Sequence, residues 1–143
     1  MFISFIKFKQ NPTVDIIYAS RFHNKSNLDG YSKLRIIVNK IFNLLTLLLT
    51  NVNISDSGCG IIFYDNKVLK KINYKDLTNG PQFNPQVNIL LGRLKSCKIL
   101  DMPLDWRDSE VGSTINSIQY CFRLLKMLLK FRINIFLGKN SFS

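Results

Sequence analysis

Blocks of apolar and polar residues alternate along the chain and predict a succession of strands and helices. Continuous apolar runs favour buried strands at residues 14–19, 61–64 and 98–102. Helical spacing and turn residues predict helices at residues 31–50, 67–72, 85–96 and 115–133. Residues 103–108 are expected to continue extended, and a polar loop is expected after the first strand.

The helix at 31–50 has an unusual pattern. Its polar positions recur every three or four residues and form one narrow stripe, made of Ser32, Arg35, Asn39, Asn43, Thr46 and Thr50. Nearly all its other positions are Ile, Leu, Val or Phe. Such a helix is either buried on most sides or rests against lipid. It is not a clean membrane span, because Arg35, Asn39, Lys40 and Asn43 interrupt the apolar window.

The last helix is amphipathic and basic. An apolar face is predicted from the spacing of Ile115, Ile118, Phe122, Leu125 and Leu129. The opposite face is predicted to carry Asn116, Gln119, Arg123, Lys126 and Lys130. Residues 115–143 contain five basic and no acidic side chains, a composition typical of helices at a membrane interface. The alternative is a surface helix packed on the core with a solvated polar face.

Composition narrows the classes of function. The chain has 143 residues, a net charge of +11, three cysteines and one histidine. One histidine and three unpaired-looking cysteines exclude a zinc cluster, a disulfide scaffold and a histidine-based triad. The positive charge suggests a polyanionic partner, although the many Asn, Ile, Lys and Phe residues also fit an AT-rich genome. No nucleic-acid partner is expected, since neither a long Lys/Arg block nor an RNA-binding motif occurs.

Six short segments, in order, resemble the C-terminal half of a family 2 glycosyltransferase, closest to the polyprenyl-phosphate sugar transferases related to dolichol-phosphate mannosyltransferase. The segments are ASRF at 19–22, Arg35 with Asn39-Lys40, ISDSGCG at 54–60, FNPQV at 83–87, ILDMPLDW at 99–106 and GST at 112–114. The match spans residues 3 to 132. The resemblance implies an α/β fold, with a partial GT-A-like sheet, flanking helices and the N-terminal nucleotide-binding half missing. Residues 1–114 would belong to that domain, and residues 115–143 would form a basic amphipathic helix and tail.

The resemblance also implies roles for individual residues. Arg21, Arg35 and Arg107 are candidates to bind the donor diphosphate or the acceptor phosphate, because arginine offers a forked, permanently charged donor. Ser20 and Ser113 would add hydroxyl contacts at strand ends. Asp56 would lie near the acceptor as a base or a polar orienter, and a phosphate acceptor needs no strong base. Trp106 is expected to pack rather than to stack on a substrate.

Two residues differ from the family pattern, and one motif is absent. Gln86 and Asp101 each stand where the family usually has Glu. The family's DxD motif, which holds a divalent metal (Mg or Mn) in the complete enzyme, does not occur in this chain. The chain is therefore expected to be part of an enzyme that transfers a sugar from a nucleotide sugar to a polyprenyl phosphate or glycan, and to be inactive alone.

The expected location is cytoplasmic and peripheral, at the inner face of the membrane, with the basic C-terminal helix against the lipid. A second hypothesis is a non-catalytic fragment that binds a membrane surface or a partner and complements a separate nucleotide-binding half. A basic nucleic-acid-binding domain is the third hypothesis; a steep salt dependence of retention on nucleic acid would favour it.

Overall fold

Strand β1 (Ile16–Ser20) is the central strand of the structure, a computed structural model that describes residues 13–107, 117–139 and 142. All five of its residues are buried, as the continuous apolar run predicts. β1 pairs antiparallel with β3 (Ile62–Tyr64) and parallel with β4 (Ile99–Pro103), in the order β3-β1-β4. Short strands β2 (Leu28–Asp29) and β5 (Trp106–Arg107) form a separate parallel pair.

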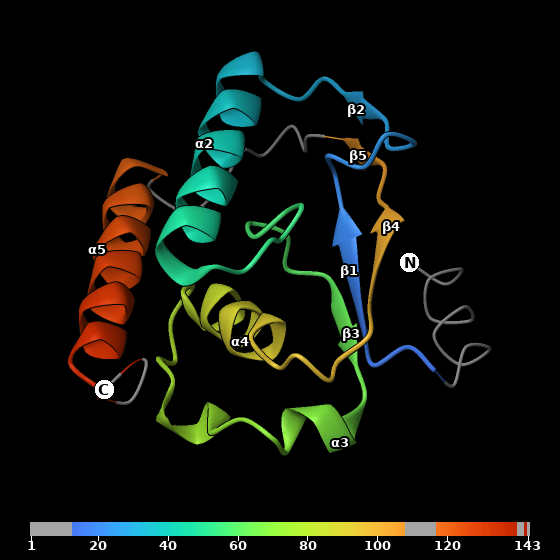
Figure 1. Ribbon diagram of the computed structural model, residues 1–143. Helices are drawn as coiled ribbons and strands as arrows, with labels where there is room; N and C mark the ends of the chain where they lie inside the picture. The colour runs from blue at the N-terminus through green and yellow to red at the C-terminus, as the bar shows by residue number, and fades with distance from the viewer. Residues whose placement is uncertain (1–12, 108–116, 140–141, 143) are drawn as a thin grey trace.

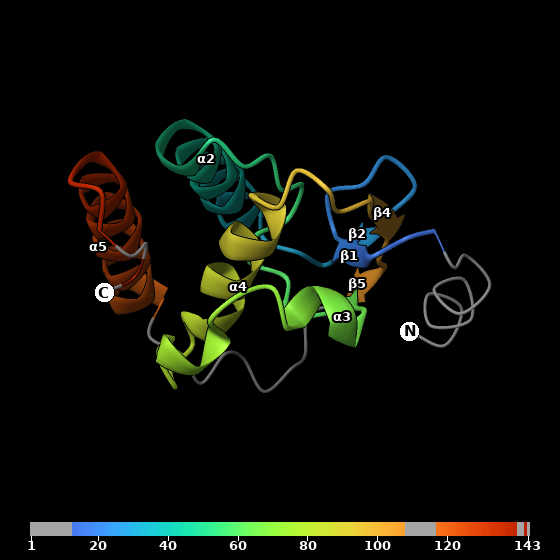
Figure 2. The ribbon, with the colours of Figure 1, turned by 60° about the horizontal axis from the view of Figure 1, so that its bottom comes forward.

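Four α-helices occur in the described part of the chain, which is therefore mixed α/β. They are α2 (Lys33–Thr50), α3 (Asn66–Leu69), α4 (Phe83–Gly92) and α5 (Ser117–Phe136), with a 3-10 turn at Tyr74–Asp76. Helices α2, α4 and α5 lie together on one side of the three-stranded sheet (Figure 1). Helices α2 and α5 lie side by side, and the turned view agrees (Figure 2). None of the described helices is both long and apolar enough to cross a membrane.

Helix α4 contributes to two apolar clusters. One cluster joins the sheet to α4 through Ile16, Tyr18, Val87 and Leu91. The other joins α4 to α5, where Ile89 packs among Leu124, Met127, Leu128 and Phe131, with Phe42, Leu45 and Leu49 of α2 beside them. The same helix therefore fixes both the sheet and α5, and its residues 85–89 and Leu91 are buried.

The strands and long helices are confirmed with shifts of a few residues at their ends. The predicted strand at 14–19 is β1, the helix at 31–50 is α2, and the helix at 85–96 begins at Phe83 and ends at Gly92. Strand β2 was not predicted, because Leu28 and Asp29 lie in a polar loop whose only sheet partner is β5, far along the chain. The capping residues expected before the last helix, Ser113 and Thr114, lie outside the described residues.

The prediction that the lysines of the last helix lie opposite its apolar face was wrong. Phe122 and Leu129 of the predicted apolar face are exposed, whereas Leu124 and Leu128 face the core. Lys126 lines one shallow hollow together with Phe122 and Leu129, so it adjoins the exposed apolar face instead of opposing it. The reason is that the helix carries two apolar sides, and the core takes the one that sequence spacing did not select.

Helix α2 turns the later part of its polar stripe inward, whereas Ser32 and Arg35 at the start of the stripe are exposed. Thr46 and Thr50 are buried, while Leu34 is 69% exposed. The two threonine hydroxyls donate to backbone carbonyls one turn earlier, those of Phe42 and Thr46, at 2.9 and 2.6 Å. Burial on most sides, one of the two alternatives for this helix, is thus wrong, because its apolar side is open.

Candidate functional site

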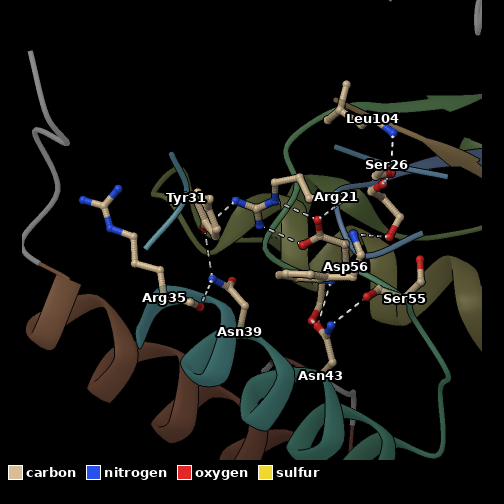
Figure 3. A network of polar contacts seen from close by, with 12 residues as sticks. Arg21, Ser26, Tyr31, Arg35, Asn39, Asn43, Ser55, Asp56 and Leu104 are labelled. Carbon is tan, nitrogen blue, oxygen red and sulfur yellow. Dashed lines mark hydrogen bonds and ion pairs between the residues drawn. The ribbon is translucent and has the colours of Figure 1, made fainter. Parts of the chain in front are cut away.

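A buried ion pair between Arg21 and Asp56 lies at the centre of the candidate site. Arg21 follows the last residue of β1, and Asp56 lies in the loop between α2 and β3. Arg21 Nε donates to Asp56 Oδ2 at 2.7 Å and Nη2 donates to Oδ1 at 2.8 Å, a forked pairing (Figure 3). The backbone N–H of Arg21 also donates to Oδ2, at 3.0 Å. Both carboxylate oxygens are therefore engaged by a single residue.

Three aromatic rings surround the Arg21 guanidinium. The distances from its Cζ atom to the ring centroids are 5.6 Å for Phe22, 5.5 Å for Tyr31 and 5.4 Å for Trp106. Cation–π attraction at these distances favours the charged guanidinium. Tyr31 also accepts a hydrogen bond from Arg21 Nη1 at 3.0 Å. We refer to Arg21, Phe22, Tyr31, Asp56 and Trp106 as the arginine cluster.

The pair is shielded from solvent, which sets its electrostatics. Arg21 is 7% and Asp56 2% exposed. Burial opposes the charge on Arg21, but the hydrogen bonds and charge of Asp56 outweigh that effect, so the pKa of Arg21 lies above its ordinary value. Cys59, whose N–H donates to the Asp56 carbonyl at 3.1 Å, is also buried, and burial raises the pKa of its thiol.

Asn43 of α2 holds the loop that carries Asp56. Its Nδ2 donates to the Ser55 carbonyl at 2.7 Å, and its Oδ1 accepts from the Ser57 N–H at 3.0 Å and from the Ser57 hydroxyl. The two neighbours of Asp56 are thus fixed by one amide. A second constraint comes from Gly58, where a Cβ would approach Asn39 Oδ1 to 2.7 Å and Arg21 Nη2 to 3.2 Å. A side chain at this position would therefore displace the Asn39 amide, and glycine lets the loop lie close to the guanidinium without that shift.

Tyr31 and Asn39 connect the cluster to the first turns of α2. Asn39 Nδ2 donates to the Tyr31 hydroxyl at 3.2 Å and to the Arg35 carbonyl at 2.8 Å. Tyr31 and Trp106 meet edge to face with their centroids 6.5 Å apart. The loop before α2 and strand β5 therefore cover the guanidinium from two directions.

The cluster lies where two parallel strands end. Ser20 of β1 pairs with Pro103 of β4, and the Leu104 N–H donates to the Ser20 carbonyl at 3.0 Å. Ser26 closes the same corner, donating to the Ser20 carbonyl at 2.7 Å and accepting from Leu104 N–H at 3.0 Å (Figure 3). In α/β sheets, ligands bind beyond the carboxyl ends of the strands. The cluster thus lies at the corresponding end of the parallel strands β1 and β4.

The structure brings together some of the predicted site residues. Ser20, Arg21 and Asp56 meet at the strand ends, but Ser20 is fully buried and its hydroxyl accepts from the Phe22 N–H at 3.2 Å. Arg35 and Arg107 are exposed at the rim, and the Arg35 side chain extends away from the ion pair (Figure 3). Ser113 lies outside the described residues.

Sequence reasoning did not assign Tyr31 or Asn43 to the site. The polar stripe of α2 contained Asn43, and its inward orientation is the feature that would have identified it. Tyr31 had no such pattern, because it precedes the helix and its contact with Arg21 depends on the path of the loop.

The resemblance implies a divalent metal in the complete enzyme, and the DxD ligands of that metal do not occur in this chain. No group of three or more His, Cys, Asp or Glu side chains lies together within the described part of the chain. Asp56, the acidic residue closest to Arg21, has both oxygens committed to it.

Comparisons with protein-family models, with curated proteins and with solved structures found no match.

Proposed function

We propose that this chain forms the acceptor side of a family 2 glycosyltransferase with a GT-A-like fold, which transfers a sugar from a nucleotide sugar to a polyprenyl phosphate or glycan. One observation carries the proposal. Segments 19–22, 35–40, 54–60 and 99–106, which carry the resemblance, meet at the arginine cluster although they are far apart in sequence. In this proposal the donor-binding half and the ligands of the Mg or Mn ion are parts of the complete enzyme that this chain does not contain.

In this proposal the rim arginines bind phosphate. Arg107 follows Trp106 in the chain, the Arg35 carbonyl accepts from Asn39 Nδ2, and both arginines are exposed residues. Forked guanidinium donors suit phosphate oxygens. Arg21 and Asp56 are positioning residues, because each is saturated by the other. An oxygen of the acceptor phosphate attacks the anomeric carbon, the bond from that carbon to the donor diphosphate breaks, and nucleoside diphosphate leaves.

Trp106 provides a direct test, since it is the only tryptophan of the chain and contacts Arg21. Farnesyl phosphate, added in detergent micelles, should produce a saturable change in Trp106 fluorescence, and farnesol should not. Arg107→Gln and Arg35→Gln should each weaken binding about tenfold or more, through loss of a charge-assisted hydrogen bond. Lys75→Gln, an exposed change on the 3-10 turn, is the matched control. Equal responses to farnesyl phosphate and farnesol would contradict phosphate recognition.

The size of the protein in its source cells tests the larger claim. Peptides from residues 15–110 identify the product, whose mass is then measured. A product larger than the 16.6 kDa of this chain supports reading the function as that of a complete glycosyltransferase. A product of 16.6 kDa directs the search to a separate partner that supplies the nucleotide-binding half.

A second candidate function is a non-catalytic membrane-surface or partner-binding fragment. The exposed apolar side of α5 favours it, because Phe122, Ile133 and Phe136 lie open to solvent beside basic residues. Both candidates imply a peripheral protein at the cytoplasmic face of a membrane. Vesicle binding without any response to farnesyl phosphate would favour the second candidate.

A further inference from the structure

Helix α2 has an exposed face made entirely of leucine and isoleucine side chains. Its side chains recur at spacings of three and four residues and are 52–69% exposed; they are Leu34, Ile37, Ile41, Leu44 and Leu48. We refer to these five residues as the outward face of α2. An apolar stripe of this length on a soluble surface marks an interaction site.

The outward face cannot turn into the core. Asn43 binds the backbone on both sides of Asp56, and Thr50 accepts from the Val52 N–H at 3.2 Å. Arg93, the residue that follows α4, donates from its Nη1 to the Thr50 carbonyl at 3.2 Å. Rotating the helix would break these hydrogen bonds and bury groups without partners.

Helix α5 lies beside α2 (Figure 1, Figure 2), and it also has exposed apolar side chains. Its exposed apolar residues are Phe122, Leu125, Leu129, Ile133 and Phe136, which we refer to as the outward face of α5. Residues of both helices that adjoin these faces carry positive charge. Lys40 is within four residues of Ile37 and Leu44 on α2, and Lys126 and Lys130 line the hollow of α5.

We propose that α2 and α5 together form one surface that lies on an anionic lipid bilayer. The outward faces enter the boundary between headgroups and acyl chains, and the long lysine side chains reach back to the headgroup phosphates. This extends the membrane contact proposed above for α5 to a second helix and assigns the side chains of α2. It does not depend on sugar transfer.

Charge argues for a bilayer and against a second copy of the chain. Neither α2 nor α5 contains an Asp or Glu, whereas α2 carries Lys33, Arg35 and Lys40. Two copies meeting through these faces would bring like charges together, at a cost in free energy. An anionic surface offers the opposite charge to all of them.

Flotation of the full chain with phospholipid vesicles tests the proposal. The chain is expected to float with vesicles of phosphatidylcholine and phosphatidylglycerol, and about tenfold less with phosphatidylcholine alone. Leu44→Glu/Leu48→Glu should lower binding to anionic vesicles about tenfold or more, since it places charge on the outward face of α2. Asn66→Glu/Asn79→Glu adds the same charge at exposed positions elsewhere and should bind within about twofold of the unmodified chain.

A parallel variant separates the two helices. Phe122→Glu/Ile133→Glu alters only the outward face of α5. If this variant loses binding while Leu44→Glu/Leu48→Glu keeps it, the inference for α2 is overturned and the contact through α5 stands. If the unmodified chain does not float, both membrane proposals fail, while the response of Trp106 to farnesyl phosphate still reports on the acceptor site.

Self-association is distinguished by light scattering after size exclusion without lipid. The proposal expects Leu44→Glu/Leu48→Glu to have the same oligomeric state as the unmodified chain. A dimer that becomes a monomer in this variant, with no vesicle binding, would overturn the proposal in favour of a second copy. Circular dichroism of each variant establishes that it folds before binding is compared.

Discussion

Arg21 and Asp56 carry opposite charges in a place that water hardly reaches. Removing two charges from water is costly, and the cost is offset here by a forked hydrogen-bonded pairing and three aromatic rings around the guanidinium. The geometry of the site therefore depends on both charges being present. Neither residue is available to a substrate without losing the other.

Asp56→Ala is expected to lower the free energy of unfolding by about 3–5 kcal/mol, because it leaves the Arg21 charge buried without its partner. Urea denaturation followed by circular dichroism measures the loss. The double variant Arg21→Leu/Asp56→Leu should recover a large part of it, since both charges are removed together. A loss below about 1 kcal/mol for Asp56→Ala would show that solvent reaches the pair.

Cys59 is expected to make the free energy of unfolding fall as the pH becomes alkaline. Burial raises the pKa of its thiol above the ordinary value of 9.0, so the folded state retains the proton longer than the unfolded state does. The resulting stabilisation is present below the ordinary pKa of the thiol and is lost as pH rises through it toward the folded-state pKa. Denaturation from neutral to alkaline pH should give a flatter slope for Cys59→Ala. Parallel slopes for the two proteins would contradict this.

At the scale of elements, α2 inverts the usual arrangement of a surface helix. Its amides and hydroxyls face inward, because the loop at 55–57 leaves backbone groups that need partners inside the molecule. Leu34, Leu44 and Leu48 consequently face outward, while Leu45 and Leu49 pack toward α5. Burial of polar groups with partners is thus the factor that orients this helix, more than burial of its apolar area.

A pair of neighbouring substitutions tests this orientation. Asn43→Leu should lower the free energy of unfolding by about 2 kcal/mol or more, although it makes the helix more apolar, because the Ser57 N–H and Ser55 carbonyl lose their partner. Leu44→Asn, one residue later and exposed, should change stability by no more than about 0.5 kcal/mol. Thermal or urea denaturation of both variants gives the comparison. Equal effects would contradict the inward orientation of the stripe.

At the scale of the whole molecule, α5 shares an apolar cluster with α2 and α4. Leu128 is fully buried within this cluster. The Cζ atom of Arg93, the residue that follows α4, lies 5.4 Å from the centroid of the Phe131 ring. The outer side of α5 carries exposed apolar and basic side chains. Its inner side packs against α2 and α4 and completes the core between them. Loosening α5 would therefore expose Ile89 of α4 together with Leu45 and Leu49 of α2.

Leu128→Ala is expected to lower the free energy of unfolding by about 2–5 kcal/mol, with circular dichroism and Trp106 fluorescence reporting one coincident transition. Leu129→Ala, its exposed neighbour, should change stability by no more than about 0.5 kcal/mol. Separate transitions for the two probes would instead indicate that α5 unfolds apart from the sheet.

Several features of the fold and site were predictable from sequence because they are properties of one segment. The apolar run of β1 required burial on both faces, and the spacing of Asn39, Asn43, Thr46 and Thr50 required a common stripe. Arg21 and Asp56 were both selected as site residues. Their pairing was not predicted, because it joins residues 35 positions apart through the path of a loop.

Apolar periodicity was enough to locate the strands and long helices and to group the side chains that share a face, since backbone geometry fixes both periodicities. Which face meets the interior depends on how the elements pack together. On α2 Asn43 of the polar stripe binds the loop around Asp56 and Thr46 and Thr50 are buried, and on α5 Leu124 and Leu128 face the core while Phe122 and Leu129 are exposed. The reason is physical: orientation depends on which groups of other elements need partners, and periodicity within one element carries no information about them.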